Sequence, residues 1–251
     1  MRKDAEKRVD SSWAEGAISI LSVLENRSRT VEQILFLEDA KKDEANIFRL
    51  LKLAKKNAVP VSTADPAFFE SVTTGHTHGG VIARVGERQM LSPAEVFQKG
   101  EGFVFLLCGI EDPFNFGSAV RSLYAAGAGG MILSTRNWMS AAGVVIRSSA
   151  GTSEALPCGV YEDPNDLARL AHEAGYRIVC ASESGATDLF TADLKKPLFL
   201  IIGGEKRGIS KDLLTQADLK IRIPYGRRFP GSLTTSSAAA VAAFEVLRFN
   251  R

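Results

Sequence analysis

Three short segments of the sequence carry residue types that could bind a small molecule and act on it. Gly203-Gly204-Glu205-Lys206-Arg207-Gly208 brings a carboxylate next to the free N–H groups of a glycine-rich turn. Gly231-Ser232-Leu233-Thr234-Thr235-Ser236 offers hydroxyl and N–H groups where a helix is expected to begin. Asn115-Phe116-Gly117-Ser118-Ala119-Val120-Arg121 adds an amide and a guanidinium. Together these segments predict a ligand pocket that is formed largely near the C-terminus.

The elements expected around the first two segments place them at one edge of a sheet. Leu198–Ile202 is apolar throughout, which is typical of a strand buried on both faces of a parallel sheet. Leu219–Ile223 is the next predicted strand, and it ends in Pro224-Tyr225-Gly226. Open α/β sheets bind ligands outside the carboxyl ends of their strands, so these loops are the predicted site.

The third segment spans a predicted turn from a strand into a helix. Phe103–Cys108 is a second doubly apolar strand, and a helix is expected from about Phe116 to Ala126. Asn115 is suited to capping that helix, and Gly117 permits close approach of another backbone. Arg121 lies about one and a half turns into the helix, where a solvated arginine is the simpler interpretation.

Composition limits the classes of protein that fit this chain. Its 251 residues can form one large domain or two ordinary ones, and its net charge of +2 argues against wholesale electrostatic binding of nucleic acid. No apolar run is long enough to span a membrane, and no apolar segment follows the charged start as in a secretory signal. Cys108, Cys158 and Cys180 are interpreted as buried hydrophobic residues in a reducing compartment. We therefore expect a cytoplasmic protein.

Charge is uneven near the predicted pocket. Between Glu205 and Arg228 there are seven basic residues and three acidic ones. A solvated surface and a site for an anionic ligand are both compatible with this patch.

Several common sites are missing from the sequence. It contains no G-x-x-x-x-G-K-[ST] phosphate loop, no early G-x-G-x-x-G after a strand and no G-x-S-x-G elbow. His76 and His78 have no cysteine or carboxylate nearby at metal-ligand spacing, so no metal site is expected. These absences disfavour a dinucleotide-binding enzyme, an ordinary Rossmann methyltransferase and an α/β-hydrolase.

Element order predicts an α/β protein with two domains. The first part alternates helices and strands and forms a compact α/β/α domain over residues 1–86. The pattern weakens over residues 87–102, which suits a linker, and residues 103–251 form the second domain. Helices between the strands of this second domain predict a parallel sheet.

A helix is predicted from Asp43 to Asn57 in the first domain. Its apolar stripe is expected to comprise five residues: Ala45, Phe48, Leu51, Leu53 and Ala54.

The order of these motifs resembles a known family. N-x-G-x-x-x-R, then G-x-E-x-x-G, then I-P-x-x-G and S-L before an alanine-rich helix is similar to the SpoU (TrmH-type) branch of the SPOUT RNA methyltransferases. Residues 103–250 resemble its catalytic domain. The first hundred residues resemble its ribosomal-protein-like RNA-binding domain, including residues 74–83.

The resemblance implies a fold, a cofactor and an assembly. It implies a deep C-terminal trefoil knot whose loops hold S-adenosylmethionine, and a homodimer formed through the C-terminal domain with active sites near the interface. The matching cofactor positions belong to three loops: Gly203, Glu205 and Gly208, then Ile223 and Pro224, then Ser232 and Leu233.

The implied reaction is methyl transfer to a ribose 2′-hydroxyl of RNA, with ribosomal RNA expected from the two-domain form. Arg121 matches the family's catalytic arginine, and Asn115, Glu205, Ser232 and Thr234 would position it and the substrate. Because a guanidinium resists deprotonation at neutral pH, anchoring a phosphate and stabilising the developing alkoxide suit Arg121 better than a role as base.

Two positions depart from the family pattern. Thr234 stands where the family commonly has Asn, and His78-Gly79-Gly80 replaces the more usual His-Gln-Gly. Threonine lacks the two-ended amide, which points to another RNA target or to reduced activity. The alternatives are therefore a non-catalytic RNA-binding or assembly protein with this fold, and tRNA in place of rRNA.

Overall fold

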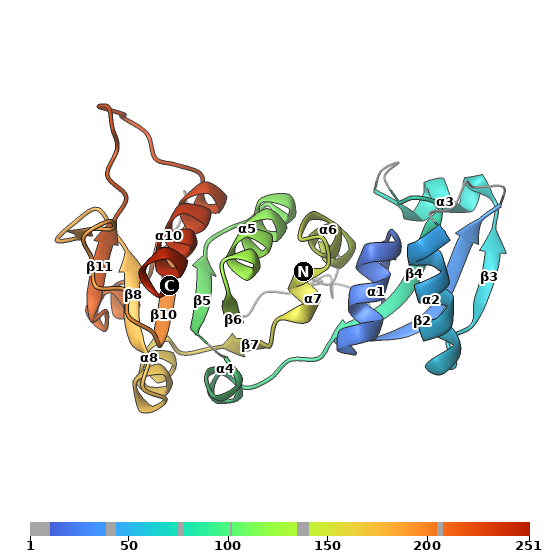
Figure 1. Cartoon of the computed structure of the whole chain (residues 1–251), viewed down its shortest axis with the longest axis horizontal. Coiled ribbons are helices and arrows are strands. Elements are labelled where there is room, and N and C mark those ends of the chain that lie inside the picture. The colour runs from blue at the N-terminus through green and yellow to red at the C-terminus, as the bar shows by residue number, and fades with distance from the viewer. Residues whose placement is uncertain (1–10, 39–43, 75–77, 101, 135–140, 205–207) are drawn as a thin grey trace, which may run out of the picture. The chain divides into compact units, whose positions relative to one another are not determined.

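The chain forms two compact units in a computed structural model (Figure 1). The first unit comprises residues 1–89 and 137–155, and the second comprises residues 90–136 and 156–251. The structure describes residues 11–38, 44–74, 78–100, 102–134, 141–204 and 208–251. Within these ranges, no helix combines the length and apolar character needed to cross a membrane.

The first unit is built on a four-stranded sheet in the order β1-β4-β2-β3, in which β3 runs parallel to β2 and the other neighbours are antiparallel. Its strands are β1 (Ser12–Glu15), β2 (Arg29–Leu37), β3 (Val61–Ala64) and β4 (Val81–Arg88). Its helices are α1 (Ala17–Asn26), α2 (Glu44–Lys56), α3 (Pro66–Val72), α6 (Ala142–Ser148) and α7 (Thr152–Ala155).

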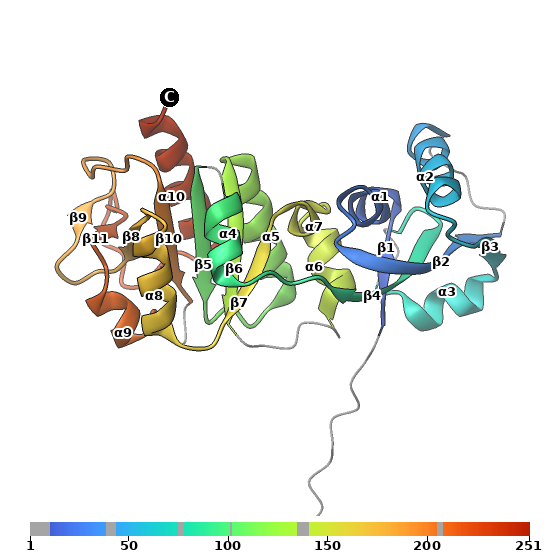
Figure 2. The same ribbon diagram turned by 90° about the horizontal axis from the view of Figure 1, so that it is seen from below.

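Alternate residues of β2 supply the cores on the two faces of this sheet. Ile34 and Phe36 join a cluster with α1 and α2, whereas Leu35 joins one with α3. This period of two is expected of a strand that is covered on both sides. The helices accordingly form layers on opposite faces of the sheet (Figure 2).

Helix α2 corrects the predicted apolar stripe. Its buried residues are Ile47, Leu50 and Ala54, whereas Phe48 is 73% exposed and Leu51 is 43% exposed. The predicted stripe is confirmed at Ala54 and wrong at Phe48 and Leu51, because apolar residues occur on both sides of this helix and spacing alone did not identify the core side.

A buried ion cluster ties the segment around α7 to the strands of the first unit. The Glu154 carboxylate accepts hydrogen bonds from Ser28 Oγ at 2.6 Å and Arg29 Nε at 3.0 Å, and it pairs with Arg88 Nη1 at 3.3 Å. Burial raises the pKa of Glu154, but the charges of Arg88 and Arg29 outweigh it and hold that pKa below its ordinary value. Removing the carboxylate would therefore leave two buried guanidinium groups without their counterion.

The second unit is built on a seven-stranded sheet in the order β7-β6-β5-β10-β8-β11-β9, with every neighbouring pair parallel. The strands are β5 (Phe103–Cys108), β6 (Ala128–Ser134), β7 (Cys158–Tyr161), β8 (Arg177–Ala181), β9 (Thr187–Asp188), β10 (Leu198–Gly203) and β11 (Leu219–Arg222). The helices are α4 (Pro93–Lys99), α5 (Pro113–Ala125), α8 (Pro164–Glu173), α9 (Lys211–Thr215) and α10 (Thr235–Phe249). The predicted mixed α/β fold with a parallel sheet is confirmed.

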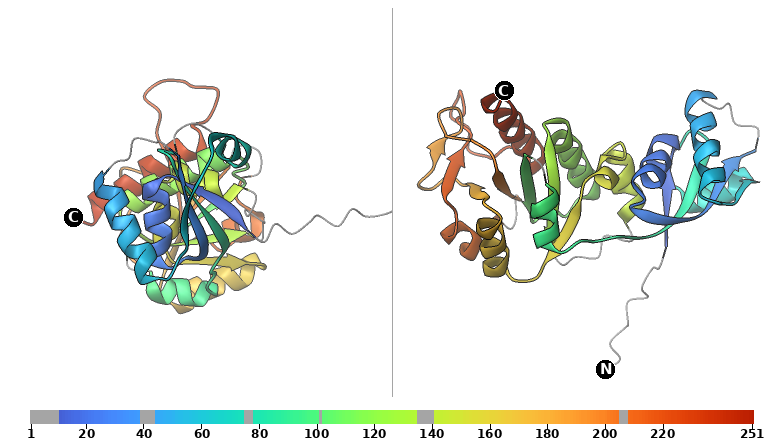
Figure 3. Two further views of the ribbon diagram at one scale, coloured as in Figure 1. Left: turned by 90° about the vertical axis from the view of Figure 1, so that its right-hand side faces the viewer. Right: turned by 60° about the horizontal axis from the view of Figure 1, so that its bottom comes forward.

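Helices cover both faces of this sheet and bury its central strands. On one face, Phe199 and Ile201 of β10 share a core with residues of α4, α8 and α9. On the other face, α10 packs against α5 and β10 (Figures 1 and 3). Leu198–Ile202 is at most 1% exposed, so the predicted doubly buried strand is confirmed.

Helix α4 lies within residues 87–102, which the sequence predicts as a linker. Ser92 and Glu95 form a capping box at its start, and Val96 and Phe97 are buried in the core of the second unit. The prediction missed the helix because its two buried residues are too few to produce a clear apolar period.

Candidate functional site

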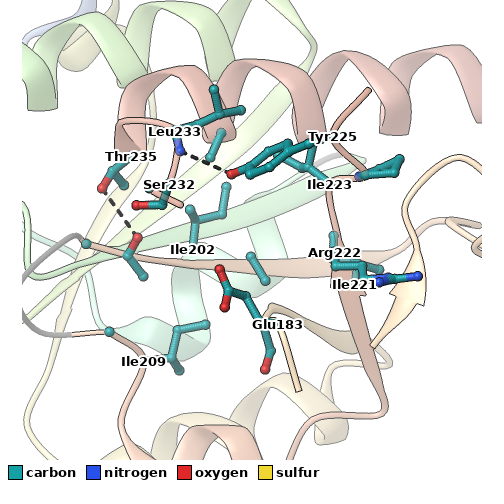
Figure 4. A pocket seen from close by; sticks show the side chains of 18 of the residues that line it. Glu183, Ile202, Ile209, Ile221, Arg222, Ile223, Tyr225, Ser232, Leu233 and Thr235 are labelled. Carbon is teal, nitrogen blue, oxygen red and sulfur yellow. Dashed lines mark hydrogen bonds between the residues drawn. The ribbon is translucent and has the colours of Figure 1, made fainter. Parts of the chain in front are cut away.

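A cavity of about 620 Å³ opens at the carboxyl ends of β8, β10 and β11 (Figure 4). Four segments line it. Three of them end or follow β8, β10 and β11, and the fourth leads into α10. The lining residues are Ala181, Ser182, Glu183, Ile202, Gly203, Gly204, Gly208, Ile209, Ile221, Arg222, Ile223, Pro224, Tyr225, Phe229, Gly231, Ser232, Leu233, Thr235 and Ala238. This is the sheet edge that the sequence indicates, and the volume is ordinary for a small-molecule site.

One wall of the cavity is formed by backbone at the end of β10. A Cβ at Gly204 would lie 2.6 Å from the Gly109 carbonyl oxygen, and a Cβ at Gly203 would lie 3.1 Å from the Gly208 Cα. Side chains are therefore sterically excluded where this strand end meets its neighbouring loops. The result is a wall of exposed main-chain groups, which can hydrogen-bond a ligand at close approach.

The opposite wall follows β11 and is closed by an aromatic pair. The Leu233 N–H donates to the Tyr225 hydroxyl oxygen at 3.1 Å, and the Tyr225 and Phe229 rings meet edge to face at 5.7 Å. Both aromatic residues line the cavity. These contacts hold the two ends of the connection between β11 and α10 together.

The first turn of α10 is fixed to the end of β10. The Thr234 hydroxyl caps the helix by accepting from the Ser237 N–H at 3.3 Å, and the Thr235 hydroxyl donates to the Gly203 carbonyl oxygen at 3.3 Å. Thr234 lies directly between two lining residues but does not itself line the cavity. Threonine and asparagine can both cap a helix. Threonine at this position, where the family commonly has asparagine, therefore keeps the local fold.

The predicted cofactor residues largely come together in this cavity. Gly203, Gly208, Ile223, Pro224, Ser232 and Leu233 all line it. Glu205, the remaining one, lies outside the described residues, as do Lys206 and Arg207 of the predicted basic patch.

Asn115 and Arg121 lie apart from the cavity lining, on helix α5. Both are exposed. The predicted cap at Asn115 is wrong: Asp112 Oδ1 accepts from the Asn115 N–H at 2.8 Å, so Asp112 is the cap. Pro113 is the first residue of α5, a position that suits proline. The helix therefore starts three residues earlier than the sequence suggested.

Glu183 is a lining residue that none of the sequence motifs includes. It follows β8, and it is the acidic side chain among the described lining residues. Its carboxylate points into the cavity (Figure 4). The segment Ala181-Ser182-Glu183 lacks glycine, but its place after a buried strand is a signal that could have identified it.

The cysteines of the second unit are unsuited to nucleophilic chemistry. Burial raises the pKa of Cys108 to about 12 and that of Cys180 to about 12. Cys158 is also buried. The Cys108 and Cys180 thiols therefore remain protonated near neutral pH, whereas the thiolate is the reactive form. Within the ranges that the structure describes, no group of three or more potential ligand residues could hold a metal ion.

Two family models match the chain. The model of the SpoU rRNA Methylase family matches residues 102–244, which include the cavity. A model described as RNA 2′-O ribose methyltransferase substrate binding matches residues 13–91.

Curated relatives carry related names. The chain is 30% identical over 205 residues to an uncharacterized tRNA/rRNA methyltransferase of Synechocystis sp., a match that covers 79% of this chain and 53% of the relative. It is 26% identical over 238 residues to the 23S rRNA (guanosine-2′-O-)-methyltransferase RlmB of Pseudomonas putida, with 93% and 94% covered. The chain therefore spans about half the length of the first relative and nearly all of the second.

Solved structures share the fold. An AdoMet-bound rRNA methyltransferase from Sinorhizobium meliloti aligns with a TM-score of 0.79 at 22% identity, covering 95% of this chain and 87% of that one. The SpoU methyltransferase AviRb from Streptomyces viridochromogenes aligns with a TM-score of 0.79 at 21% identity, covering 98% and 92%.

Proposed function

Because the chain belongs to the SpoU rRNA Methylase family, we propose that it transfers a methyl group from S-adenosylmethionine to a ribose 2′-hydroxyl of ribosomal RNA. The observation that carries the proposal is the cavity at the carboxyl ends of β8, β10 and β11. Residues from three sequence motifs line it, and it lies within the family match. The name of the Pseudomonas putida relative supports 23S rRNA as the RNA. With ribosomal RNA as substrate, the protein acts in the cytoplasm.

The cavity suits S-adenosylmethionine in shape and charge. The glycine wall offers main-chain groups, and Ile202, Ile221 and Leu233 offer apolar surface. Glu183 supplies a negative charge that faces a cationic ligand. When bound, the cofactor supplies an electrophilic methyl group on a sulfonium. We propose Gly203, Glu205, Gly208, Ile223, Pro224, Ser232 and Leu233 as the residues that hold it.

The residues proposed for the chemistry must bind RNA and stabilise a developing alkoxide. Arg121 keeps its positive charge at neutral pH, so it can hold a phosphate or stabilise the 2′-oxygen as its proton passes to solvent, with S-adenosylhomocysteine as the leaving group. Asn115, Glu205, Ser232 and Thr234 are proposed to orient the arginine and the ribose. The remaining requirement is alignment of the 2′-oxygen with the methyl carbon and the sulfur.

We propose a homodimer through the second unit. Four aromatic side chains on α5 and α10 support it, because their exposure is high for large apolar groups: Phe114 50%, Tyr124 44%, Phe244 48% and Phe249 41%. Arg121 and Asn115 are exposed on α5 as well. In such a dimer they would lie at the interface, which is where the family resemblance expects the active sites. Sedimentation of the full chain tests the proposal: a monomer at micromolar concentration would contradict it.

The strand order is compatible with the proposed trefoil knot. Strand β10 lies between β5 and β8, both of which precede it in the chain. Helix α10 then returns to pack against α5. We therefore propose that the second unit contains a C-terminal trefoil knot.

The family matches support the proposed division of labour between domains. We propose residues 1–86 as the RNA-binding domain and residues 103–251 as the methyltransferase domain, although residues 137–155 belong to the first compact unit. The first compact unit extends to Gln89, and α4, whose buried Val96 and Phe97 belong to the core of the second unit, follows it, so we assign residues 90–102 to the methyltransferase domain.

Substitution of Arg121 tests the proposed reaction. Arg121→Ala should lower methyl transfer to rRNA by about 10²–10³-fold, the usual cost of losing one group that stabilises a developing oxyanion. S-adenosylmethionine affinity should stay the same, because Arg121 lies outside the cavity lining. Arg169→Ala on α8 is the matched control, since Arg169 is also an exposed helix arginine. Equal activity of the two variants would contradict the role of Arg121.

A further inference from the structure

Helix α2 of the first unit has an aromatic residue on its solvent side. Its buried side is formed by Ile47, Leu50 and Ala54, and Phe48 is 73% exposed on the other side. At 100° per residue, Phe48 lies roughly opposite Leu50 on the helix. Phe48 is therefore not an edge residue of the core, and its ring is presented to solvent.

Phe48 belongs to a stripe that also carries positive charge. Leu51, Lys52 and Lys55 follow it at spacings of three, four and seven residues, which places all four on one face. Leu51 is 43% exposed, and both lysines are exposed. We call these four residues the α2 face.

The charge of α2 is one-sided. Between Ala45 and Lys56 the helix contains Arg49 and three lysines and no acidic residue. Arg49 pairs with Glu25 of α1 at 2.7 Å, whereas Lys52 and Lys55 form no ion pair with the described residues. The α2 face thus combines a flat apolar ring with cations that remain available to an anionic partner.

These properties fit one kind of partner better than others. Unpaired RNA bases stack on exposed aromatic rings while lysines contact the neighbouring phosphates. A protein partner or a second copy of the chain would need acidic groups to complement the lysines. The match of residues 13–91 to a substrate-binding model favours RNA.

We propose that the α2 face binds an unpaired stretch of the RNA substrate, with one base stacked on Phe48 and phosphates held by Lys52 and Lys55. This inference rests on the proposed function, because it assumes that RNA is the substrate. Through the α2 face, the first unit selects single-stranded RNA.

The aromatic part is tested by a graded series at Phe48 in the full-length protein. Binding of unmodified 23S rRNA transcript is measured by filter retention. Phe48→Ala should weaken binding roughly 5- to 150-fold, the range found for loss of one base–aromatic stack. Phe48→Tyr should retain affinity because it keeps the ring, whereas Phe48→Leu should lose it despite a similar apolar size. The control is Phe190→Ala, which removes an aromatic residue of the second unit that is 53% exposed.

The charged part is tested by salt dependence. A Lys52→Ala/Lys55→Ala variant should reduce the slope of log affinity against log salt by about 1.4, since each phosphate contact with single-stranded nucleic acid contributes about 0.7. The matched control is Lys99→Ala/Lys195→Ala, which removes two exposed lysines of the second unit and should leave the slope unchanged.

The outcomes separate this inference from the proposed reaction. If Phe48→Leu binds RNA as tightly as the unaltered protein, or the lysine variant keeps its slope, the α2 face is not the RNA surface. If Phe48→Ala changes the sedimenting mass, the face packs on a second copy and the inference also fails. If RNA binding responds as expected but no RNA is methylated, the surface stands and the proposed reaction falls. Unchanged S-adenosylmethionine affinity and unfolding midpoint show that each variant is folded.

Discussion

The two units depend on different physical features. In the first, the Glu154 carboxylate is 1% exposed and is neutralised by Arg29 and Arg88, which are 9% and 7% exposed. In the second, β5 and β10 are packed by apolar side chains on both faces, and the cavity at their edge has a wall of glycine backbone. The first unit should therefore be sensitive to ionisation, and the second to side-chain volume.

Loss of the buried carboxylate is expected to have the largest effect on stability. Glu154→Gln should destabilise the protein at pH 7 by about 3–5 kcal/mol, because two buried guanidinium groups lose their counterion. The measurement is chemical unfolding. Glu173→Gln, which breaks an exposed pair with Arg169, is the control and should cost less than about 1 kcal/mol. Similar losses in both variants would remove the contrast between the units.

The stability of the protein should also depend on pH through Glu154. The pKa of Glu154 lies below its ordinary value of 4.5 in the folded protein, so the stability that it contributes is complete above the unfolded-state pKa. That stability is lost as the pH falls through the folded-state pKa. Acid unfolding should therefore be steeper in the unaltered protein than in Glu154→Gln. Parallel curves between pH 5 and pH 2 would contradict the charged state of Glu154.

Added volume should destabilise the second unit, whereas loss of a charge should destabilise the first. Gly204→Ala places a Cβ 2.6 Å from the Gly109 carbonyl oxygen, so we expect a loss of about 1–3 kcal/mol in stability. The same shift in the cavity wall should weaken S-adenosylmethionine binding about tenfold if about 1.4 kcal/mol falls on the bound state. Gly226→Ala is the control because a Cβ there meets nothing within 4 Å. Calorimetric titration of both variants checks the prediction, and equal affinities would refute it.

The cap of α10 should have a smaller effect. Thr234→Ala removes the acceptor for the Ser237 N–H and should cost about 1 kcal/mol in unfolding free energy. Thr234→Asn keeps a capping oxygen and should preserve stability. If Thr234→Asn also raises methyl transfer, the amide contributes to the reaction; if activity stays the same, threonine serves only as the cap.

The smallest effect is expected at the cavity mouth, where charge is exposed to solvent. Glu183→Gln should weaken S-adenosylmethionine binding only roughly two- to fivefold, since exposed ion pairs contribute little. S-adenosylhomocysteine lacks the sulfonium charge, so its affinity should change less. Equal losses for the two ligands would show that Glu183 acts by something other than charge.

The sequence predicted the parts of the fold that have strong local signals. Leu198–Ile202 and Phe103–Cys108 are continuous apolar runs, and both are central strands of the parallel sheet. The Gly- and Pro-rich loops after β10 and β11 also led to the cavity, because ligands of such sheets bind at that edge.

The parts that failed depend on tertiary contacts. The buried side of α2 is decided by what packs on it, and helix α4 gains its stability from a core that only the folded unit provides. Glu154 meets Ser28 across 126 residues of sequence, and no local pattern encodes that contact. Glu183 lacked a glycine signal, although its strand was predicted.

Mapping the methyl group in RNA tests the central claim most directly. Unmodified 23S rRNA is incubated with the full-length protein and methyl-labelled S-adenosylmethionine, and the labelled nucleotide is then located and identified. We predict a single 2′-O-methylated nucleotide whose formation requires Arg121. A methyl group on a base, or cofactor binding without any labelled RNA, would contradict the account.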